Sequence, residues 1–568
     1  MAGIGDIKAA LHKSGARVFS ARGFATRPRP STSLDLCFRL LQALQKQRAL
    51  SGRYEYILEP LHAALIAQPR EERHYWVSTF YTLLMDDETK RKNATYFTPP
   101  YIVRHLIRCA EEAGFDPRKD TALDPAAGGA AFVSSLAGRM MREGCTSEDV
   151  RSRLRGIEID KNLAALAEIH LAHTLTGQYE RRISLKTVRV GNALNVRGGD
   201  LYDAVFMNPP FGRLLGGAHH DTEKWNAICD PGHVNKYALF VALALRLVRP
   251  GGLIALISPA SYIAGPLFSR MREQIRRTTD VIRLDVLERD NVFFSVQQDA
   301  VTAIFRKRAE PRTNRSLFFA PCGQIGRGWK ARQIGTARSA DNDFGSAWIL
   351  PGGGGEHDDV AFVSCPGRLA DFGVHIKAGY FVWNREKSRL NKKRLKATET
   401  QYPLLWAKNI SAGRWCWPAS KDGKTVDFVS FGTENAGVID TSAIALQRTT
   451  NNKQRRRLLA AIVPSTVIDT YGGFVTENHT IAVVPAKAGV KLDLVCRLLN
   501  SAAVDARYRR IAGTASVSVS SLRDLPLPKP EHLRESLRIA DDFERAVELA
   551  YQKSSTALTL PTPVRAVR

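Results

Sequence analysis

The residues with the clearest chemical potential are Asn208, Pro209, Pro210 and Phe211, which follow the apolar run Ala204 to Met207. The run predicts a strand. Two consecutive prolines cannot continue a central strand, so they end it in a rigid, extended turn. Such a turn holds an amide, a backbone carbonyl and an aromatic face together at the carboxyl end of a strand, where open α/β sheets bind ligands. Taken alone, the tetrapeptide is equally explained as a strand terminator with a turn asparagine.

Two further segments follow predicted strands upstream. Asp124 to Phe132 combines an acid with small residues that open a helix. Small residues let the backbone approach a ligand closely, and a helix N-terminus favours a negative group. Glu158 ends the next predicted strand, where an acid can accept hydrogen bonds from both hydroxyls of a ribose. The alternatives are a plain strand–helix connection at the first segment and a helix N-cap at Asp160 in the second.

In this order the segments resemble the N6-adenine DNA methyltransferases of the gamma arrangement, in the long restriction-modification form with a C-terminal target-recognition domain. The resemblance runs from about Thr95 to Lys307 and extends more faintly beyond it. It implies an α/β fold, a doubly wound and Rossmann-like domain that depends on S-adenosylmethionine (SAM). It also implies that the catalytic residues are Asn208, Pro209, Pro210 and Phe211.

The same resemblance assigns the cofactor contacts. Thr98, Asp124 and Gly128 correspond to the residues around the methionine end of SAM, and Glu158 to the acid that holds the ribose. Asn192 stands where the family usually has an acid that reads the adenine amine. A further departure is Ala130, which replaces a common glycine; its methyl group adds little bulk, and we expect cofactor binding to survive.

The implied reaction needs an adenine amine whose lone pair is localised. The side-chain oxygen of Asn208 and the carbonyl of Pro209 would accept hydrogen bonds from the two N–H groups, and the transfer is then a matter of alignment. A base inside a duplex must first be flipped out. Phe211 would stack on that base, and Phe293 is favoured over Phe294 as a second stacking residue.

The charge and composition indicate a globular protein with a polyanionic partner. The chain carries 82 Lys+Arg against 56 Asp+Glu, a net charge of +26, which indicates a polyanionic partner. We expect double-stranded DNA, with phosphate contacts from Arg448, Arg455, Arg456 and Arg457; a solvated charged face is the alternative for each arginine. Apolar residues make up 44% and charged residues 24%, the balance of a globular protein.

Nothing in the sequence predicts a membrane span, a metal site or a disulfide framework. No stretch approaches eighteen apolar residues without a charge, and the eight cysteines form no CxxC pair. The basic first thirty residues lack the apolar core of a secretory signal, and a loose tail is favoured over a mitochondrial transit peptide. We therefore expect a protein of the bacterial cytoplasm without membrane or metal.

The pattern along the chain predicts five segments. Residues 1–32 are expected to be a disordered basic tail, 33–90 a helical region, 91–310 the catalytic domain, 311–545 a mixed α+β target-recognition domain and 546–568 a tail. The predicted catalytic strands are Thr121–Leu123, Leu154–Ile159, Thr187–Val190, Tyr202–Met207, Gly252–Ser258 and Val301–Phe305. The helices predicted between them are Pro100–Ala113, Ala130–Arg142, Leu163–Thr174 and Lys236–Val248. Beyond them, helical patterns return at Arg456–Ile462 and Leu492–Leu499.

Three other functions fit parts of the pattern. Relatives with a similar tetrapeptide methylate ribosomal RNA or protein glutamine, but those are usually compact, whereas this chain continues for more than two hundred residues. A fused restriction-modification enzyme would use the acid-x-Lys unit of Asp86–Lys90, but no β-sheet is predicted before it. We therefore expect any restriction endonuclease to be a separate partner acting on the same site. A catalytically inactive DNA-binding protein is the third alternative.

Overall fold

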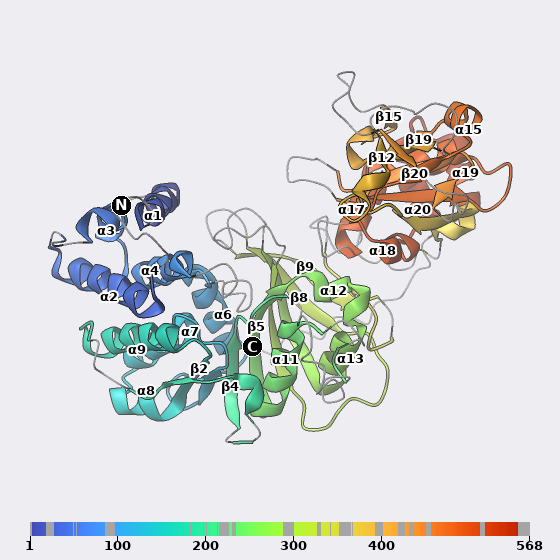
Figure 1. The fold of residues 1–568 in the computed structure, drawn as a ribbon. Coiled ribbons are helices and arrows are strands. Elements are labelled where there is room, and N and C mark those ends of the chain that lie inside the picture. Colours follow the sequence, from blue (N-terminus) through green and yellow to red (C-terminus); the bar gives the residue numbers. More distant parts are fainter. Residues whose placement is uncertain are drawn as a thin grey trace. The chain divides into compact units, whose positions relative to one another are not determined.

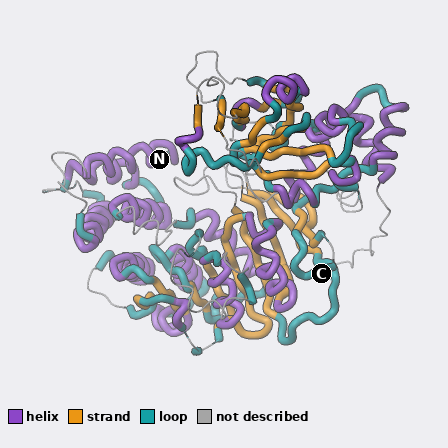
Figure 2. Tube along the Cα trace, turned by 45° about the vertical axis from the view of Figure 1, so that its right-hand side comes forward, coloured by secondary structure: helices purple, strands orange, loops and turns teal. Residues whose placement is uncertain are grey.

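The alternation of apolar runs and helical patterns between residues 100 and 310 folds into one mixed sheet flanked by helices (Figures 1 and 2). The computed structural model describes residues 3–554 except 19–27, 49, 51, 53, 86–96, 181–184, 197, 200, 213, 215–226, 230–233, 288–299, 326–330, 341, 352–364, 366, 392–400, 418–426, 431–436, 450–455 and 512–516. The chain divides into two units. The first takes residues 1–262, 267–333 and 341–346, and the second takes 263–266, 334–340 and 347–568.

Eight strands of the first unit are hydrogen-bonded in the order β8-β6-β7-β5-β4-β1-β2-β3. Their bounds are β1 (Ala122–Asp124), β2 (Leu154–Glu158), β3 (Val188–Val190), β4 (Tyr202–Met207), β5 (Val248–Pro259), β6 (Thr279–Leu287), β7 (Ala300–Lys307) and β8 (Phe319–Ile325). Strands β1 to β5 run parallel to one another, β7 is antiparallel to both β5 and β6, and β8 is parallel to β6. The predicted doubly wound, mostly parallel sheet is confirmed.

Helices connect these strands and cover both faces of the sheet. Their bounds are α6 (Pro100–Glu112), α7 (Ala131–Arg142), α8 (Ser147–Arg153), α9 (Lys161–Thr176), α11 (Lys236–Leu247), α12 (Ser261–Ala264) and α13 (Ser269–Thr278). Successive residues of β5 are buried on opposite faces, because side chains alternate along a strand. Leu253, Ala255 and Ile257 join the core formed with α6 and α7. Ile254 and Leu256 are equally buried, on the other face.

Four helices precede the sheet: α1 (Ile4–Val18), α2 (Pro30–Lys46), α3 (Glu55–Leu65) and α4 (Arg70–Leu84). They share one apolar core with α9, to which α9 contributes Leu163, Leu166 and Ile169. Figure 1 shows α2 and α4 beside α9. The prediction of a disordered tail over residues 1–32 is therefore wrong for α1. Its buried residues Ile7 and Leu11 recur at helical spacing and give the helix an apolar face.

A buried ionic cluster fastens α6 to the sheet. Asp285 of β6 accepts a hydrogen bond from His105 Nε2 at 2.7 Å and is paired with the guanidinium of Arg283 at 2.8 Å. Cys109 Sγ lies 3.4 Å from the same His105 nitrogen. The arrangement of His105, Cys109 and Asp285 has the residue types of a metal site, but Arg283 supplies the positive charge that Asp285 faces. The cluster fixes the helix that directly follows Thr98.

The second unit is built on an antiparallel sheet and a mixed sheet, with helices around them. Its main sheet has the order β11-β21-β18-β19, from strands β11 (Val374–Ala378), β18 (Ala443–Gln447), β19 (Ala460–Val463) and β21 (Thr480–Pro485). A second sheet has the order β12-β16-β13-β20-β17, from β12 (Leu390–Asn391), β13 (Gln401–Leu405), β16 (Phe428–Ser430), β17 (Val438–Ile439) and β20 (Phe474–Thr476). In this mixed sheet β13 and β20 are parallel. A short hairpin pairs β14 (Ile410–Ser411) with β15 (Arg414–Trp415).

The helices of this unit are α15 (Ser465–Tyr471), α16 (Leu492–Leu499), α17 (Ala502–Ile511), α18 (Val519–Arg523), α19 (Pro530–Ile539) and α20 (Phe543–Ser554). The helix predicted at Leu492–Leu499 is confirmed. The helical pattern predicted at Arg456–Ile462 is wrong, because β19 occupies the end of it. The mixed α+β architecture matches the prediction for this half.

Two predicted boundaries differ from the structure. β8 belongs to the first unit, and the change of unit falls within β9 (Ala331–Ser339), which pairs with β10 (Trp348–Ile349), so residue 310 is too early. The segment 546–568, predicted as a tail, begins inside α20, and its residues beyond 554 are not among the described ones. Among the described residues, no helix is both long enough and apolar enough to cross a membrane.

Candidate active site

Three parallel strands deliver the candidate residues to one edge of the sheet. Asp124 is the last residue of β1, Glu158 the last of β2, and Asn208 directly follows β4. The register pairs Asp124 with Gly156 and Leu123 with Val205, so the three strands end side by side. Carboxyl ends of parallel strands meet at one edge, and this edge is where a ligand is expected in such a fold.

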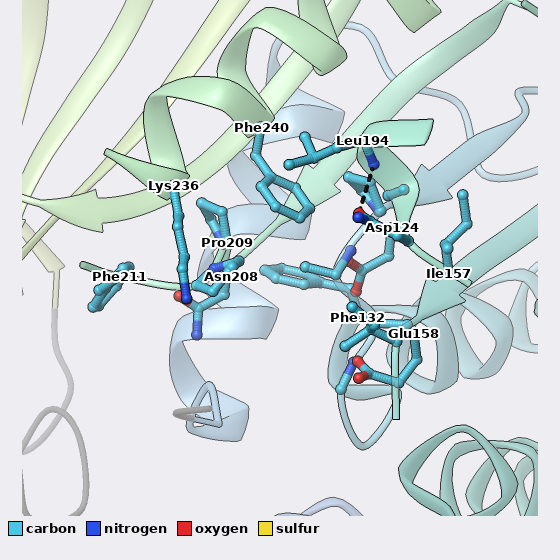
Figure 3. A pocket seen from close by; sticks show the side chains of 18 of the residues that line it. Asp124, Phe132, Ile157, Glu158, Leu194, Asn208, Pro209, Phe211, Lys236 and Phe240 are labelled. Atoms are coloured by element: carbon cyan, nitrogen blue, oxygen red, sulfur yellow. Dashed lines mark hydrogen bonds between the residues drawn. The ribbon is translucent and has the colours of Figure 1, made fainter. Parts of the chain in front are cut away.

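A cavity of about 330 Å³ opens at this edge, and all nine residues predicted for catalysis and cofactor binding line it. They are Thr98, Asp124, Gly128, Glu158, Asn192, Asn208, Pro209, Pro210 and Phe211. Figure 3 shows Asp124 and Glu158 toward one end of the cavity, and Asn208, Lys236 and Phe211 toward the other. The site therefore has an acidic end and an end that carries the catalytic candidate.

The amide of Asn208 is held in one orientation by Thr98. Its Nδ2 donates a hydrogen bond to Thr98 Oγ1 at 3.0 Å, and Thr98 is buried. Thr98 precedes Pro99 and Pro100, which begin α6, so the hydroxyl is carried by a rigid helix start. Thr98 was expected only to contact the cofactor; in the structure it lies in the cavity and also orients the catalytic candidate.

Glu158 is tied to the glycine-rich loop. Its Oε2 accepts a hydrogen bond from Gly128 N at 2.9 Å, and its Oε1 accepts one from Asp160 N at 2.9 Å. Burial raises the pKa of Glu158 above its ordinary value, and the two backbone donors oppose that rise. The carboxylate thus fixes the loop and still faces the cavity. Asp160 itself caps α9, accepting from Asn162 N and Leu163 N, as predicted.

Asp124 is a buried acid beside Glu158. Its Oδ1 accepts a hydrogen bond from Ala126 N at 3.0 Å, which shapes the turn after β1. Burial raises the pKa of Asp124 to about 8, and the neighbouring charge of Glu158 acts in the same direction. A cationic ligand at this end would favour the charged form of both acids.

The glycine-rich loop adopts left-handed backbone at two positions. Gly128 has φ +53°, and Ala130 has φ +63°, a conformation that costs a residue with a Cβ roughly 1–2 kcal/mol. Having alanine instead of the family's glycine at position 130 therefore matters through the left-handed backbone conformation and not through the size of the side chain. A side chain at Gly128 would press on the ring of Phe97, 3.2 Å away, so the loop is closely covered there.

Histidines from α4 and α9 support the loop from beneath. His170 Nδ1 lies 3.0 Å from the carbonyl oxygen of Gly129, and its ring stacks on His74 with 4.1 Å between centroids. Burial lowers the pKa of His170 to about 4, so the ring is neutral near pH 7 and donates to that carbonyl. A side chain at Gly129 would collide with the hydroxyl of Ser78 on α4. The N-terminal helices are thus part of the support of the site.

Asn192 and Phe211 line the cavity, but each also has a structural contact that limits its predicted role. Asn192 Oδ1 accepts a hydrogen bond from Leu194 N at 3.1 Å and so caps the short turn after β3 (Figure 3). Its carbonyl is engaged locally, although the residue lines the cavity. Phe211 lines the far end of the cavity but is only 7% exposed and belongs to the core of the sheet. A stacking role for Phe211 therefore uses the small part of the ring that faces the cavity.

Sequence reasoning did not single out Leu214, Lys236 or Phe240, which lie outside the quoted motifs and also line the cavity. Lys236 begins α11, and its backbone N donates to Gly212 O at 2.9 Å, which brings the helix start close to the turn after Phe211. Figure 3 shows the Lys236 side chain beside Asn208. The sequence did predict a helix that begins at Lys236. It did not predict that the first residue of this helix contacts the turn after Phe211.

Of the other predicted residues, the three that the structure describes, Arg448, Arg456 and Arg457, are not among those that line this cavity. Phe293, its neighbour Phe294 and Arg455 lie outside the described residues. Arg456 donates to the carbonyl of Asn500 within the second unit, and Arg457 N donates to Asp505 Oδ1 at 2.6 Å. Arg448 is exposed, with its guanidinium 3.1 Å from Asn478 O.

Comparisons with known proteins give the following relatives. A family model described as Eco57I restriction-modification methylase matches residues 153–293. Type II methyltransferase M.PstI of Providencia stuartii is 22% identical over 370 residues, which are 61% of this chain and 69% of that protein. Type II methyltransferase M.BsuBI of Bacillus subtilis is 21% identical over 475 residues, 78% and 89% of the two chains.

Among solved structures, the Type IIL restriction-modification enzyme MmeI in complex with DNA has a TM-score of 0.49 at 12% identity, covering 96% of this chain and 90% of that one. The family match includes Glu158, Asn192 and the Asn208–Phe211 turn. The resemblance to restriction-modification methyltransferases is therefore confirmed. The gamma arrangement is not named by these comparisons.

Proposed function

We propose that this chain transfers a methyl group from SAM to the N6 amine of adenine within a specific DNA sequence, as the modification enzyme of a restriction-modification system. The observation that carries the proposal is the Asn208–Phe211 turn. It lies at the carboxyl end of β4 and lines one cavity with Glu158 and Asp124, and Thr98 orients its amide. The relatives named as Type II methyltransferases support methyl transfer, and the choice of the adenine amine is part of the proposal.

The donor set of the cavity fits SAM. A cationic ligand suits an end lined by Asp124 and Glu158, and a ribose diol suits a carboxylate that is already oriented by two backbone donors. Gly128 allows the close approach of the loop backbone to the methionine end, and Asn192 lies where the base would be read. SAM supplies the electrophilic methyl group when bound.

The protein's part in the reaction is positioning. With Nδ2 of Asn208 committed to Thr98, the opposite side of the amide presents Oδ1 as an acceptor. We propose that Oδ1 and the Pro209 carbonyl accept hydrogen bonds from the amine of a flipped adenine, which localises its lone pair. Phe211 closes the end of the cavity, and Lys236 provides a cation beside Asn208 for the substrate. Well-aligned reactants gain several kcal/mol over the same groups free in solution.

The net charge of the chain and the size of the second unit both support DNA as the substrate. A net charge of +26 suits a polyanion, and phosphate contacts contribute most of the affinity of such complexes. The second unit begins near residue 334 and is large enough to hold a dedicated reader of sequence. A separate endonuclease that cleaves the same site, when unmethylated, is the expected partner of the system.

The test is methyl transfer from labelled SAM to duplex DNA, with ribosomal RNA as the competing substrate. Modified-base sequencing of DNA from cells that express the chain identifies the base and the site. Asn208→Ala should abolish transfer while leaving the SAM dissociation constant within about threefold, because the lost hydrogen bonds matter mainly in the transition state. Asn195→Ala, at an exposed position near the same edge, is the matched control and should stay active. Activity of Asn208→Ala near the wild-type level would refute the proposal.

A further inference from the structure

One end of the main sheet of the second unit gathers three segments that are far apart in the sequence. The strand registers pair Ala378 with Ile481 and Gln447 with Thr480. The chain leaving β11, the chain leaving β18 and the turn before β21 therefore meet at this end. Side chains from around Tyr380 and from Arg448 are brought to one place, although the sequence separates them by more than sixty residues.

The turn Glu477–Thr480 binds these segments together through backbone hydrogen bonds. Asn478 N donates to Phe381 O at 2.8 Å, and Arg448 N donates to His479 O at 2.8 Å. Just before the turn, Thr476 O accepts from both Tyr380 N and Phe381 N at 2.9 Å. The Arg448 guanidinium adds a hydrogen bond to Asn478 O at 3.1 Å. The surface is thus built on a fixed backbone frame.

Two aromatic side chains project from this frame. Phe381 is fully buried and anchors the segment, whereas Tyr380 is 49% exposed and Trp383 is 39% exposed. Within the described part of the second unit, these are the only aromatic side chains so exposed. The ring of Tyr380 packs against the backbone of Gly437, where any side chain would collide with it. Exposed aromatic rings that lie together on one surface, rimmed by polar residues, are typical of an interaction site.

Exposed cations follow the two rings in the chain that leaves β11, and Arg448 adds another at the same end of the sheet. Arg385, Lys387, Arg389 and Arg448 are all exposed. Lys387 Nζ lies 5.6 Å above the ring of Trp383. The only acid between residues 377 and 389 is Glu386, which pairs with Arg389 at 3.3 Å. The surface therefore combines a net positive charge with two aromatic faces.

We propose that this surface, formed by Tyr380, Trp383, Arg385, Lys387, Arg389 and Arg448, is where the second unit binds duplex DNA. The inference rests on the proposed function, and it names the contact surface. Arg385, Lys387, Arg389 and Arg448 bind backbone phosphates, and the rings of Tyr380 and Trp383 pack on sugars and base edges along a groove. Among the predicted arginines that the structure describes, Arg448 alone belongs to this surface.

The test is a binding titration with a fluorescent 40-base-pair duplex at several salt concentrations. Mixed sequence suffices, because the phosphate contribution does not depend on sequence. The double variant Arg385→Ala/Lys387→Ala should lower the slope of log affinity against log salt by up to about 1.8, which is about 0.9 for each phosphate that the variant no longer neutralises. Trp383→Ala should weaken binding about tenfold at every salt concentration without changing the slope.

The matched control is Arg534→Ala/Arg538→Ala, which removes the same charge from exposed positions on α19 of the same unit. Its slope should equal that of the wild type. Equal slopes in both double variants, or a Trp383→Ala variant that binds like the wild type, would overturn the assignment of this surface. Failure of the proposed function is separate: the wild-type protein would then transfer no methyl group to DNA, whatever its binding slopes.

Discussion

Replacing Glu158 by Gln separates a cofactor contact from a structural one. The carboxylate accepts from Gly128 N and from Asp160 N, each at 2.9 Å. A glutamine has one acceptor oxygen, so one backbone donor loses its partner, and the ribose of SAM loses a charged acceptor. A hydrogen bond to a charged group contributes about 1.5–3 kcal/mol, so the SAM dissociation constant should rise roughly 10- to 150-fold.

The stability of the Glu158→Gln variant should change little. Burial raises the pKa of Glu158, which means that desolvation of the charge outweighs its hydrogen bonds in the protein alone. A neutral amide avoids that cost and offsets the lost backbone bond. SAM affinity of the wild type should also fall as the pH falls through this raised pKa, because a protonated carboxyl is a poorer acceptor. The Gln variant should lose that dependence.

Glu168→Gln provides the matched control. Glu168 is buried and accepts hydrogen bonds from four successive backbone N–H groups, those of Leu185 to Val188, outside the cavity. Its replacement should lower the melting temperature and leave SAM affinity near that of the wild type. Titration calorimetry at pH 8 and thermal unfolding measure both quantities. If Glu158→Gln binds SAM within threefold of the wild type, or if the two variants behave alike, the cofactor role of Glu158 is refuted.

Three other expectations can be measured directly. The pKa of Asp124 is raised to about 8 by burial, so its contribution to the free energy of unfolding is complete below the unfolded-state pKa near 4 and is lost as the pH rises toward 8. In thermal unfolding, the melting temperature of the wild type should fall relative to that of Asp124→Asn as the pH rises from about 4 to about 8. The pKa of His173 is lowered to about 4 by burial, so the stability it contributes is present above about pH 6.5 and is lost as the pH falls toward 4. His173→Phe keeps the stack on Tyr179 and should retain at most about 1 kcal/mol more unfolding free energy than the wild type at pH 5, by denaturant titration, because solvent screens this partly exposed ring. Lys236→Met should raise the KM for DNA at least fivefold in methyl-transfer assays, with an unchanged SAM dissociation constant.

Periodicity predicted the catalytic sheet well because its strands are short apolar runs. Five of the six predicted strands match the observed strands within two residues at each end, and β5 begins four residues before its prediction. β6 was missed because Arg283 and Asp285 interrupt its apolar pattern, and only the buried ionic cluster explains why they are there. α1 was missed because its basic composition concealed the helical spacing of Ile7 and Leu11.

The candidate site could be predicted where residues follow directly on a strand. Asp124, Glu158 and Asn208 are of this kind, since parallel strands must end at one edge. The hydrogen bond between Asn208 and Thr98 could not be predicted, because it joins residues that are 110 positions apart and that only the packing of α6 brings together. The surface around Tyr380 was also hidden, since its cations looked like an ordinary basic stretch until the sheet register brought Arg448 beside them.

The shared core of the N-terminal helices and α9 has a consequence for how the chain folds during synthesis. α2 (Pro30–Lys46) emerges first, but α9 (Lys161–Thr176), which completes its core, follows more than a hundred residues later. At roughly 5–20 residues per second, the ribosome needs several seconds or more to supply that partner. During this interval the apolar side chains of these helices that α9 covers are exposed to other nascent chains. Correct folding of the first unit during translation therefore requires that these side chains do not associate with other chains before α9 has been synthesised.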